Sequence, residues 1–498
     1  MTDKKIKGPT ELHTFLPNDN PKEELTTKYK VQVIPKDVEV ATSLTDPSRF
    51  DPFAGRDCKT ATSDGQTLTH LLKASLGTGI LSMPFAFRSA GLVFGIFATM
   101  FVSLICTHCS YILVKCAHVL YHKTKKTEMS YAEVAEATFA SGPKILHKFA
   151  SPSRYFVQIS LFITYFGTCS AYTVIIAKSF REVFDHYVYN QGINGHLSNS
   201  TVLNATLENV SHSPIGTDIR IFIACLLIPL ILLVCVPNLK YLAPVSMVAN
   251  FFMATGLAIT FYYIFQDLSH ISDVPLIVGD ISKFPTFFSI SIFAMEAIGV
   301  IMPLENNMKT PQNFIGICGV MNKGMSAVTL IYILLGALGY IRYFPVTEPN
   351  ELITSDLDIN EIPAQVVKIL VGLAVFCTFG LQFFVCLDIL WTEIKDRFTK
   401  RPRLANYIAR TLMAIGCVLI AIAVPTIAPL IGLIGAFCFS LLGLLAPVVI
   451  EMVVFWDVGF GRFNWIVIKN IVITIVGILA LIFGTKSAIN DIYEQMIK

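Results

Sequence analysis

Residues 67–84 read TLTHLLKASLGTGILSMP, and this stretch decides how the rest of the chain is interpreted. Its flanks are apolar enough for a membrane helix, but its centre holds Gly77, Thr78 and Gly79, with Pro84 five residues later. Glycine lowers helix stability and proline removes a backbone donor, so the sequence predicts a helix that unwinds at this point. In a membrane, unwound backbone survives only where it lines a cavity or is buried in protein.

A second stretch carries the same kind of interruption. Residues 293–306 read FAMEAIGVIMPLEN, with the ionisable Glu296 at mid-span, Gly299 beside it and Pro303 beyond. The two stretches lie in the first and sixth apolar segments, which are corresponding members of two five-helix halves. Paired interruptions at matching places indicate a central binding site. The alternative is close helix packing at the glycines, which requires neither a proline nor a mid-span Glu.

The composition indicates an all-α polytopic membrane protein. Of 498 residues, 54% are hydrophobic and only 15% are charged, whereas a soluble domain is nearer a quarter charged. Apolar segments of about 20 residues recur, and each is long enough to cross hydrocarbon. We expect eleven transmembrane helices, at 67–89, 92–120, 155–180, 218–237, 240–265, 285–305, 320–342, 364–390, 405–425, 428–453 and 464–485.

The distribution of charge predicts the orientation of these helices. Lys and Arg concentrate in the segments 121–154 and 391–404, whereas 343–362 contains Glu and Asp but no Lys or Arg. The positive-inside rule places the two basic segments in the cytosol and the acidic segment outside. The N-terminus is then cytosolic, and an odd number of spans puts the C-terminus outside.

Glycosylation sequons predict the same orientation. Asn199, Asn204 and Asn209 each begin an Asn-x-Ser/Thr sequon, and all three fall in the segment between the third and fourth spans. Glycans are added on the lumenal side, so this segment is expected to be external and glycosylated.

The chemistry of an interrupted helix pair suits an amino acid. Free N–H groups at the positive end of a half-helix attract a carboxylate, and free carbonyls with a nearby acidic side chain hold an ammonium. Glycine at the break leaves space and permits positive φ angles. The predicted substrate-binding residues are Ser75, Gly77, Thr78, Gly79, Phe293, Glu296, Ala297 and Gly299. For Glu296, a structural hydrogen bond to unwound backbone is the alternative to direct substrate contact.

His70 is the candidate for proton coupling. It lies about two helical turns before the first break, and an imidazole titrates near pH 6.5, where it can accept a proton from an acidic exterior. The alternative is a neutral histidine that is hydrogen-bonded within the helix bundle.

The two interrupted motifs, from His70 to Pro84 and from Phe293 to Asn306, resemble those of the proton-assisted amino acid transporters. These form solute carrier family 36 in the amino acid/auxin permease superfamily, and the likeness covers about residues 62–487. It implies a leucine-transporter-like fold of two inverted five-helix repeats plus one helix, and transport of small neutral amino acids. It also implies a proton-coupling role for His70, and location at the plasma membrane or on lysosomes and endosomes. Many members have Gly-Asn where this chain has Ala74-Ser75, which affects the substrate range.

Other functions remain alternatives at this stage. A sodium-coupled amino acid carrier is one, and a lysosomal amino acid sensor with little transport is another. We expect no enzyme activity, no cofactor, no metal and no nucleic-acid partner; protons, amino acids and the lipid bilayer are the expected partners. Residues 1–62 are polar and are expected to form a disordered cytosolic tail that could hold a signalling partner. Residues 63–487 form the predicted transporter domain, and 488–498 a short tail.

Overall fold

The structure is a computed structural model of the whole chain. It describes residues 50–53, 56, 61–197, 217–236, 239–266, 268, 273–277, 281–295, 297–344, 350–398 and 400–497. Over these ranges the chain is helical, with a single isolated parallel bridge between Thr62 and Met308 and no longer strand.

The α-helices follow one another along most of the described chain. They are α1 Asp64–Ser75, α2 Met83–Ala90, α3 Leu92–Thr124, α4 Tyr131–Ser141, α5 Ala150–Leu197, α6 Ile219–Cys225, α7 Leu227–Val234, α8 Leu239–Gln266, α9 Phe284–Met295, α10 Ile298–Asn306, α11 Val320–Tyr343, α12 Ile362–Ile394, α13 Pro402–Ala423, α14 Ile427–Leu433, α15 Ala446–Val454, α16 Trp465–Leu479 and α17 Thr485–Ile497. Short 3₁₀ segments are η2 Thr78–Ser82, η3 Lys144–Phe149, η5 Ile281–Lys283, η6 Pro311–Asn313, η7 Ile353–Ser355, η8 Lys395–Arg397 and η10 Arg462–Asn464, and π-helical segments are η9 Ile434–Leu445 and η11 Ala480–Gly484.

Nine helical stretches of the described chain are long and apolar enough to cross a membrane, which confirms a polytopic α-helical protein. They match nine of the expected spans, from Leu92–Thr124 to Trp465–Glu494. The fourth expected span instead consists of α6 and α7, which divide at Leu226. Pro229 explains this division, because it has no N–H to donate to the carbonyl four residues earlier, at Cys225. The total of eleven spans therefore stays a prediction.

Several helices differ from the expected boundaries, and α5, for example, runs from Ala150 to Leu197 instead of over 155–180. The basic segment 121–154 is more ordered than a simple loop, because α4 lies within it and begins at a capping box formed by Ser130 and Glu133. At the other end of the chain, helical structure continues past the expected end at 485, through η11 and α17, to Ile497.

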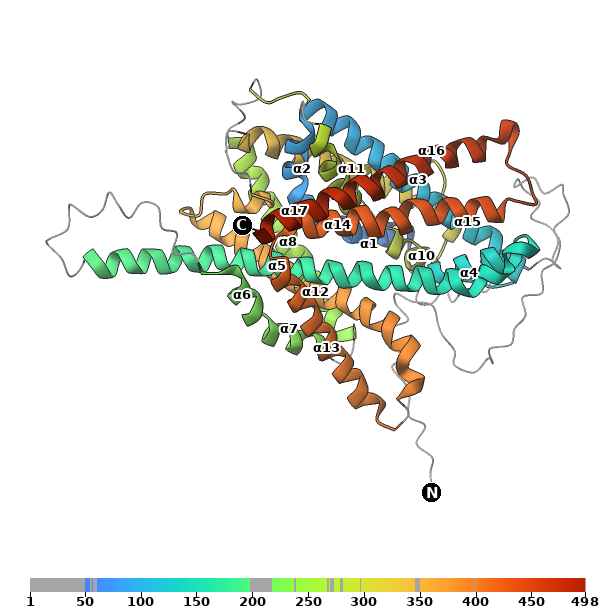
Figure 1. The fold of residues 1–498 in the computed structure, drawn as a ribbon, viewed down its shortest axis with the longest axis horizontal. Coiled ribbons are helices and arrows are strands. Elements are labelled where there is room, and N and C mark those ends of the chain that lie inside the picture. The colour runs from blue at the N-terminus through green and yellow to red at the C-terminus, as the bar shows by residue number, and fades with distance from the viewer. Residues whose placement is uncertain are drawn as a thin grey trace. The chain divides into compact units, whose positions relative to one another are not determined.

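The described residues divide into two compact units, and the first unit holds both interrupted stretches. It takes its residues from 1–164, 275–337 and 431–498. Within it α15 packs against α3 and α16, and Figure 1 shows these three helices side by side. The π-helical η9 packs against α9, so this unit surrounds α9 with helices from both ends of the chain.

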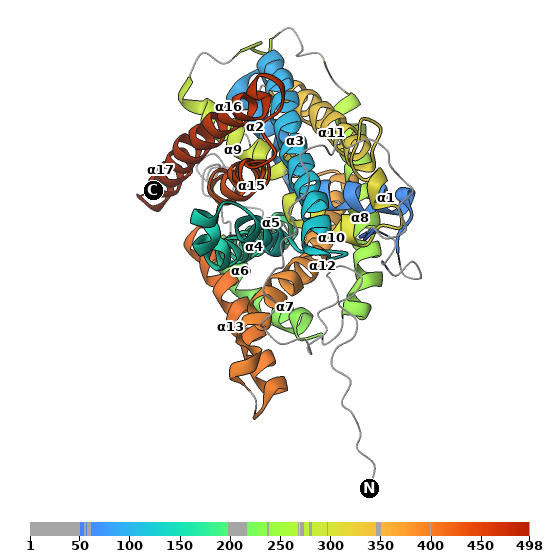
Figure 2. The same cartoon turned by 90° about the vertical axis from the view of Figure 1, so that its right-hand side faces the viewer.

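The second unit takes its residues from 165–274 and 338–430. Its main contact is α8 against α12, and α13 packs against α6 and α7, as Figure 2 shows. Arg410 of α13 donates hydrogen bonds to the carbonyl oxygens of Val234 and Val236, at 2.6 and 2.8 Å. It thereby supplies donors to carbonyls at the C-terminal end of α7. Lys368 of α12 is 97% buried and pairs with Glu182 of α5 at 2.7 Å.

Candidate functional site

The first transmembrane stretch is interrupted at the predicted place. Helix α1 ends at Ser75, and Leu76 leaves the helical region with φ −80° and ψ 57°. Gly77 is extended, with φ −81° and ψ −165°, and the chain then resumes as η2 and α2. Neither glycine uses the positive φ angles that it permits, because Gly77 has a negative φ and Gly79 lies inside the 3₁₀ segment.

The sixth stretch is interrupted too. Helix α9 ends at Met295 and α10 begins at Ile298, with Ala297 at φ −118° and ψ 9° between them. Pro303 lies inside α10 and has no N–H to donate to the carbonyl of Gly299, four residues earlier. Ala297, which precedes α10, provides no side-chain hydrogen bond to cap this helix.

The two interrupted stretches are antiparallel neighbours in the first unit. Helix α1 contacts α10, whereas α2 and η2 both contact α9. The start of one stretch therefore lies beside the end of the other, and the two breaks come together. A Cβ atom on Gly79 would lie 2.8 Å from the Cα of Ala294. Glycine is required at position 79 because another backbone approaches it closely.

Tyr332 of α11 links the two breaks, and no motif in the sequence marks this residue. Its hydroxyl lies 2.7 Å from the carbonyl oxygen of Ser75 and 3.0 Å from that of Ala294, and it donates toward both. These are carbonyls at the ends of α1 and α9, where the helical hydrogen-bond pattern stops. The side chain is fully buried, and a buried tyrosine hydroxyl usually has such partners.

Several buried hydroxyl groups near the breaks have no hydrogen-bond partner within the described ranges. They belong to Thr78 and Ser82 of η2 and to Ser291 of α9. A buried polar group without a partner costs free energy, so such groups usually have a partner that the protein itself does not supply. Their position on two touching segments suits a polar ligand or ordered water.

The predicted substrate-binding residues that the structure describes lie on these same segments. Ser75 is the last residue of α1, Gly77 precedes η2, and Thr78 and Gly79 are buried inside it. Phe293 is buried in α9 with its ring centroid 6.0 Å from that of Phe439. Ala297 and Gly299 lie at the start of α10.

Other predicted residues are more distant or cannot be placed. His70 is half-buried in α1, one turn before Lys73 and apart from the break. Glu296 and the three sequon residues Asn199, Asn204 and Asn209 lie outside the described residues. Their roles stay predictions.

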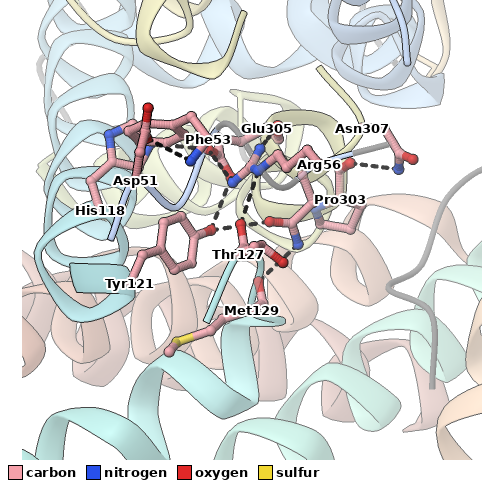
Figure 3. A network of polar contacts seen from close by, with 11 residues as sticks. Asp51, Phe53, Arg56, His118, Tyr121, Thr127, Met129, Pro303, Glu305 and Asn307 are labelled. Atoms are coloured by element: carbon pink, nitrogen blue, oxygen red, sulfur yellow. Dashed lines mark hydrogen bonds and ion pairs between the residues drawn. The ribbon is translucent and has the colours of Figure 1, made fainter. Parts of the chain in front are cut away.

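A second polar cluster lies at the C-terminal end of α10, the end away from the break (Figure 3). The carboxylate of Glu305 accepts hydrogen bonds from Arg56 at 3.0 Å and from the Tyr121 hydroxyl at 2.9 Å. It also lies 3.0 Å from Nε2 of His118. Arg56 additionally donates to the carbonyl of Thr127 at 2.9 Å. The segment before α1 is thereby fastened to α3 and α10.

A third cluster places charge at membrane depth. Glu451 of α15 has only 1% of its side chain exposed and lies 2.9 Å from the Lys469 ammonium of α16. Lys469 also donates to Nε2 of His108 at 3.1 Å. Glu451, near the C-terminal end of α15, is thus paired with a cation of the neighbouring helix. Within the described ranges, no three of His, Cys, Asp and Glu gather closely enough to hold a metal ion.

Comparisons with known proteins address the chain as a whole. The family model described as transmembrane amino acid transporter protein matches residues 60–490. The chain is similar to the proton-coupled amino acid transporter-like protein pathetic of Drosophila melanogaster, at 54% identity over 98% of this chain and 96% of that protein. It is also similar to amino acid transporter AVT3C of Arabidopsis thaliana, at 23% identity over 91% and 96%.

Among solved structures, the inward-facing conformation of Mhp1 is similar with a TM-score of 0.49 and 11% identity, covering 91% of this chain and 95% of that one. A likeness of this size is too weak to assign a fold by itself. The family match, by contrast, spans most of the chain, and the Drosophila relative is more than half identical over nearly its full length. The chain therefore belongs to the transmembrane amino acid transporter family, which confirms its resemblance to solute carrier family 36 of the amino acid/auxin permease superfamily.

Proposed function

We propose that this protein is a proton-coupled secondary transporter of small neutral amino acids, which bind where the two interrupted helices meet. The observation that carries the proposal is the antiparallel contact of the two breaks, which Tyr332 joins through Ser75 and Ala294. Two inverted five-helix repeats would produce this arrangement, since inversion brings corresponding helices together in opposite directions.

The substrate carboxylate binds to backbone N–H groups at the breaks. Neither Gly77, before η2, nor Ala297, before α10, provides a side-chain cap for the segment that follows. These N–H groups lie at the positive ends of short helices, where an anion is favoured. The partnerless hydroxyl of Thr78 lies next to the first break and provides a further donor.

The substrate ammonium binds at the opposite side of the breaks. Backbone carbonyls are available there, including that of Gly299, which Pro303 leaves without its usual helical donor. Glu296 is the acidic group closest in sequence to this position. The backbones at Gly79 and Ala294 are in close contact, and a narrow space between them favours small side chains on the substrate.

Proton coupling through His70 is the second part of the proposal. The Drosophila relative is named as proton-coupled, and that is the reason for preferring protons over sodium here. His70 lies on the same helix as the first break, so a change in its charge acts directly on α1.

The topology and the cellular location complete the proposal. Residues 1–62 form a cytosolic segment, of which Arg56 and Thr62 pack against the transporter domain of 63–487, and 488–498 form a C-terminal tail that is helical as far as Ile497. The N-terminus faces the cytosol, and the protein resides at the plasma membrane or on lysosomes and endosomes. A signalling partner binds the N-terminal tail if the protein is also a sensor.

Uptake into proteoliposomes tests this function. Purified protein is reconstituted and supplied with labelled glycine, alanine or proline at external pH 7.5 and 5.5, with sodium or with choline. The proposal expects uptake that rises at pH 5.5 and does not need sodium. Uptake that requires sodium would indicate a sodium-coupled carrier, and binding without uptake would indicate a sensor.

A further inference from the structure

A cavity of about 680 Å³ opens on the first unit. Its walls come from α3, α9 and the last helical stretch of the chain, and its volume is typical of small-molecule sites. The main wall residues are Phe101, Ile105, Phe284, Phe288, Leu479 and Phe483. These side chains are all apolar, so the body of the cavity suits a hydrocarbon ligand.

Polar groups gather at one end of this cavity. Ser282 precedes α9, and Lys486, Ser487 and Asn490 lie in α17, so all four are near the ends of the two apolar spans Ile281–Asn306 and Trp465–Glu494. The other end is lined by Leu444 and other apolar residues farther along the spans. The cavity therefore has a polar rim at the membrane surface and an apolar interior.

The cavity also opens sideways toward the membrane. Phe101, Leu479 and Phe483 line it, yet each keeps 45 to 52% of its surface exposed. At this depth the surrounding solvent is lipid, so the molecules that can enter are those of the bilayer. Hydrocarbon chains match such walls, because burial of apolar surface away from water is favourable.

The charge at the rim selects the headgroup. Lys486 is exposed and has no ion-pair partner in the part of the chain that the structure describes. Asp491 and Glu494 follow on the same helix but do not line the cavity. An ammonium beside hydroxyl and amide donors is the set that binds phosphate, through charge-assisted hydrogen bonds. We infer that the cavity binds one phospholipid of the bilayer, with its phosphate at Lys486 and an acyl chain among the phenylalanines.

The wall geometry connects this lipid to α9. The π-helical η11 forms part of the wall, and π-helical turns occur frequently at functional sites. At its end, a Cβ atom on Gly484 would lie 2.4 Å from the Oγ of Ser289, so η11 and α9 are in direct contact. A bound lipid therefore supports the half-helix whose other end is the second break.

A photoreactive phospholipid tests the inference. Purified protein in nanodiscs receives a phosphatidylcholine probe with a diazirine in its acyl chain, and labelled peptides are mapped by mass spectrometry. Labelling is expected in residues 281–292 and 476–490. Ala480→Trp, which fills the cavity, is expected to reduce it about tenfold, or about 1.4 kcal/mol of binding. Lys486→Glu is expected to reduce it as well, because it repels the phosphate.

Two controls make the test decisive. Lys144→Glu changes an exposed lysine outside the cavity and is expected to leave labelling unchanged. Size-exclusion chromatography checks that each variant is folded. If Ala480→Trp does not fold, Lys486→Glu alone still tests the inference. Absence of label from both peptides in the parent protein overturns the inference. A sterol probe that labels them when the phospholipid probe does not would overturn it too. None of these outcomes depends on whether the protein transports amino acids.

Discussion

Arg56 and Glu305 form an ion pair, with 3.0 Å between Nη2 and Oε1, in which the side chains keep only 7% and 0% of their surface exposed. The pair joins the segment before α1 to the last turn of α10 (Figure 3). Arg56 also lies 5.4 Å from the ring centroid of Tyr121, which supports the guanidinium from a third element, α3. The two interrupted stretches are thus fastened together at the end opposite to η2 and α9. By the proposed topology this end is cytosolic, so its release is required for α1 and α10 to separate there.

Removal of Arg56 tests the strength of this pair. Arg56→Met leaves the buried carboxylate of Glu305 without its cation, and loss of one partner of a buried pair costs about 3–5 kcal/mol. The double variant Arg56→Met/Glu305→Gln is expected to lose less than the sum of the single changes. Thermal unfolding of the purified protein measures both effects. Arg154→Met, which breaks the more exposed pair with Glu136, serves as a control and should cost no more than about 1 kcal/mol. Equal stability of Arg56→Met and Arg154→Met would contradict the role of the buried pair.

Tyr332→Phe removes the hydroxyl that joins the two breaks. The carbonyls of Ser75 and Ala294 then lose a donor inside the protein, at a cost of about 1–3 kcal/mol. We expect uptake of labelled amino acid to fall strongly while the amount of protein in the membrane stays near normal. Tyr155→Phe, at an exposed tyrosine, should transport normally. Unchanged uptake by Tyr332→Phe would show that the hydroxyl does not set the geometry of the breaks.

The breaks themselves could be predicted because their causes are local. Gly77, Pro84 and Pro303 act through their own backbone, and the sequence shows all three. The need for space at Gly79 could be anticipated from the sequence. The neighbour that occupies this space could not, because the backbone that approaches Gly79 belongs to Ala294, more than 200 residues later.

The contacts between residues far apart in the chain could not be predicted from the sequence either. Tyr332 lies 257 residues from Ser75, and Arg56 lies 249 residues from Glu305, and neither pair has a fixed spacing that a motif could encode. Helix α4 is different, since Ser130 and Glu133 form a capping box at a spacing that the sequence does show. That signal could have identified a helix in the basic segment 121–154.

Glycosylation tests the orientation. Replacement of Asn199, Asn204 and Asn209 by Gln should convert a diffuse band into a faster, sharp band on a gel, without loss of membrane insertion. Endoglycosidase treatment of the parent protein should produce the same shift. If protein from a eukaryotic host carries no glycan, the external assignment of this segment loses its main support.

His70→Ala tests proton coupling. If the imidazole accepts the coupled proton, uptake by the parent protein rises as external pH falls from about 7.5 to 5.5, across the usual pKa of histidine. The variant should show flat pH dependence while still binding substrate. His147→Ala, at an exposed histidine of the basic segment, should keep the pH response of the parent protein. A pH response that persists in His70→Ala would move coupling to another group, for which His108 beside Lys469 is the next candidate.

Gly79→Val tests whether the two breaks form the substrate site. Its side chain would meet the Cα and Cβ of Ala294 at under 3 Å, so η2 and α9 would have to move apart. We expect uptake to be abolished while expression persists. Gly65→Val in α1 is the matched control, because a Cβ at Gly65 has no neighbour within 4 Å beyond its own chain neighbours and the backbone of its own helix.

Substrate analogues test which chemical group of the substrate binds at the breaks. If the backbone N–H groups at the start of η2 and α10 hold a carboxylate, amines that lack this group should compete poorly with labelled alanine. Glu296→Gln probes the other end of the substrate, and it should weaken affinity if that carboxylate binds the ammonium. Normal transport by Gly79→Val would mean that η2 and α9 can separate without harm. Equal competition by amines would mean in addition that the breaks do not hold a carboxylate, and the substrate site would then have to lie on other helices of the protein.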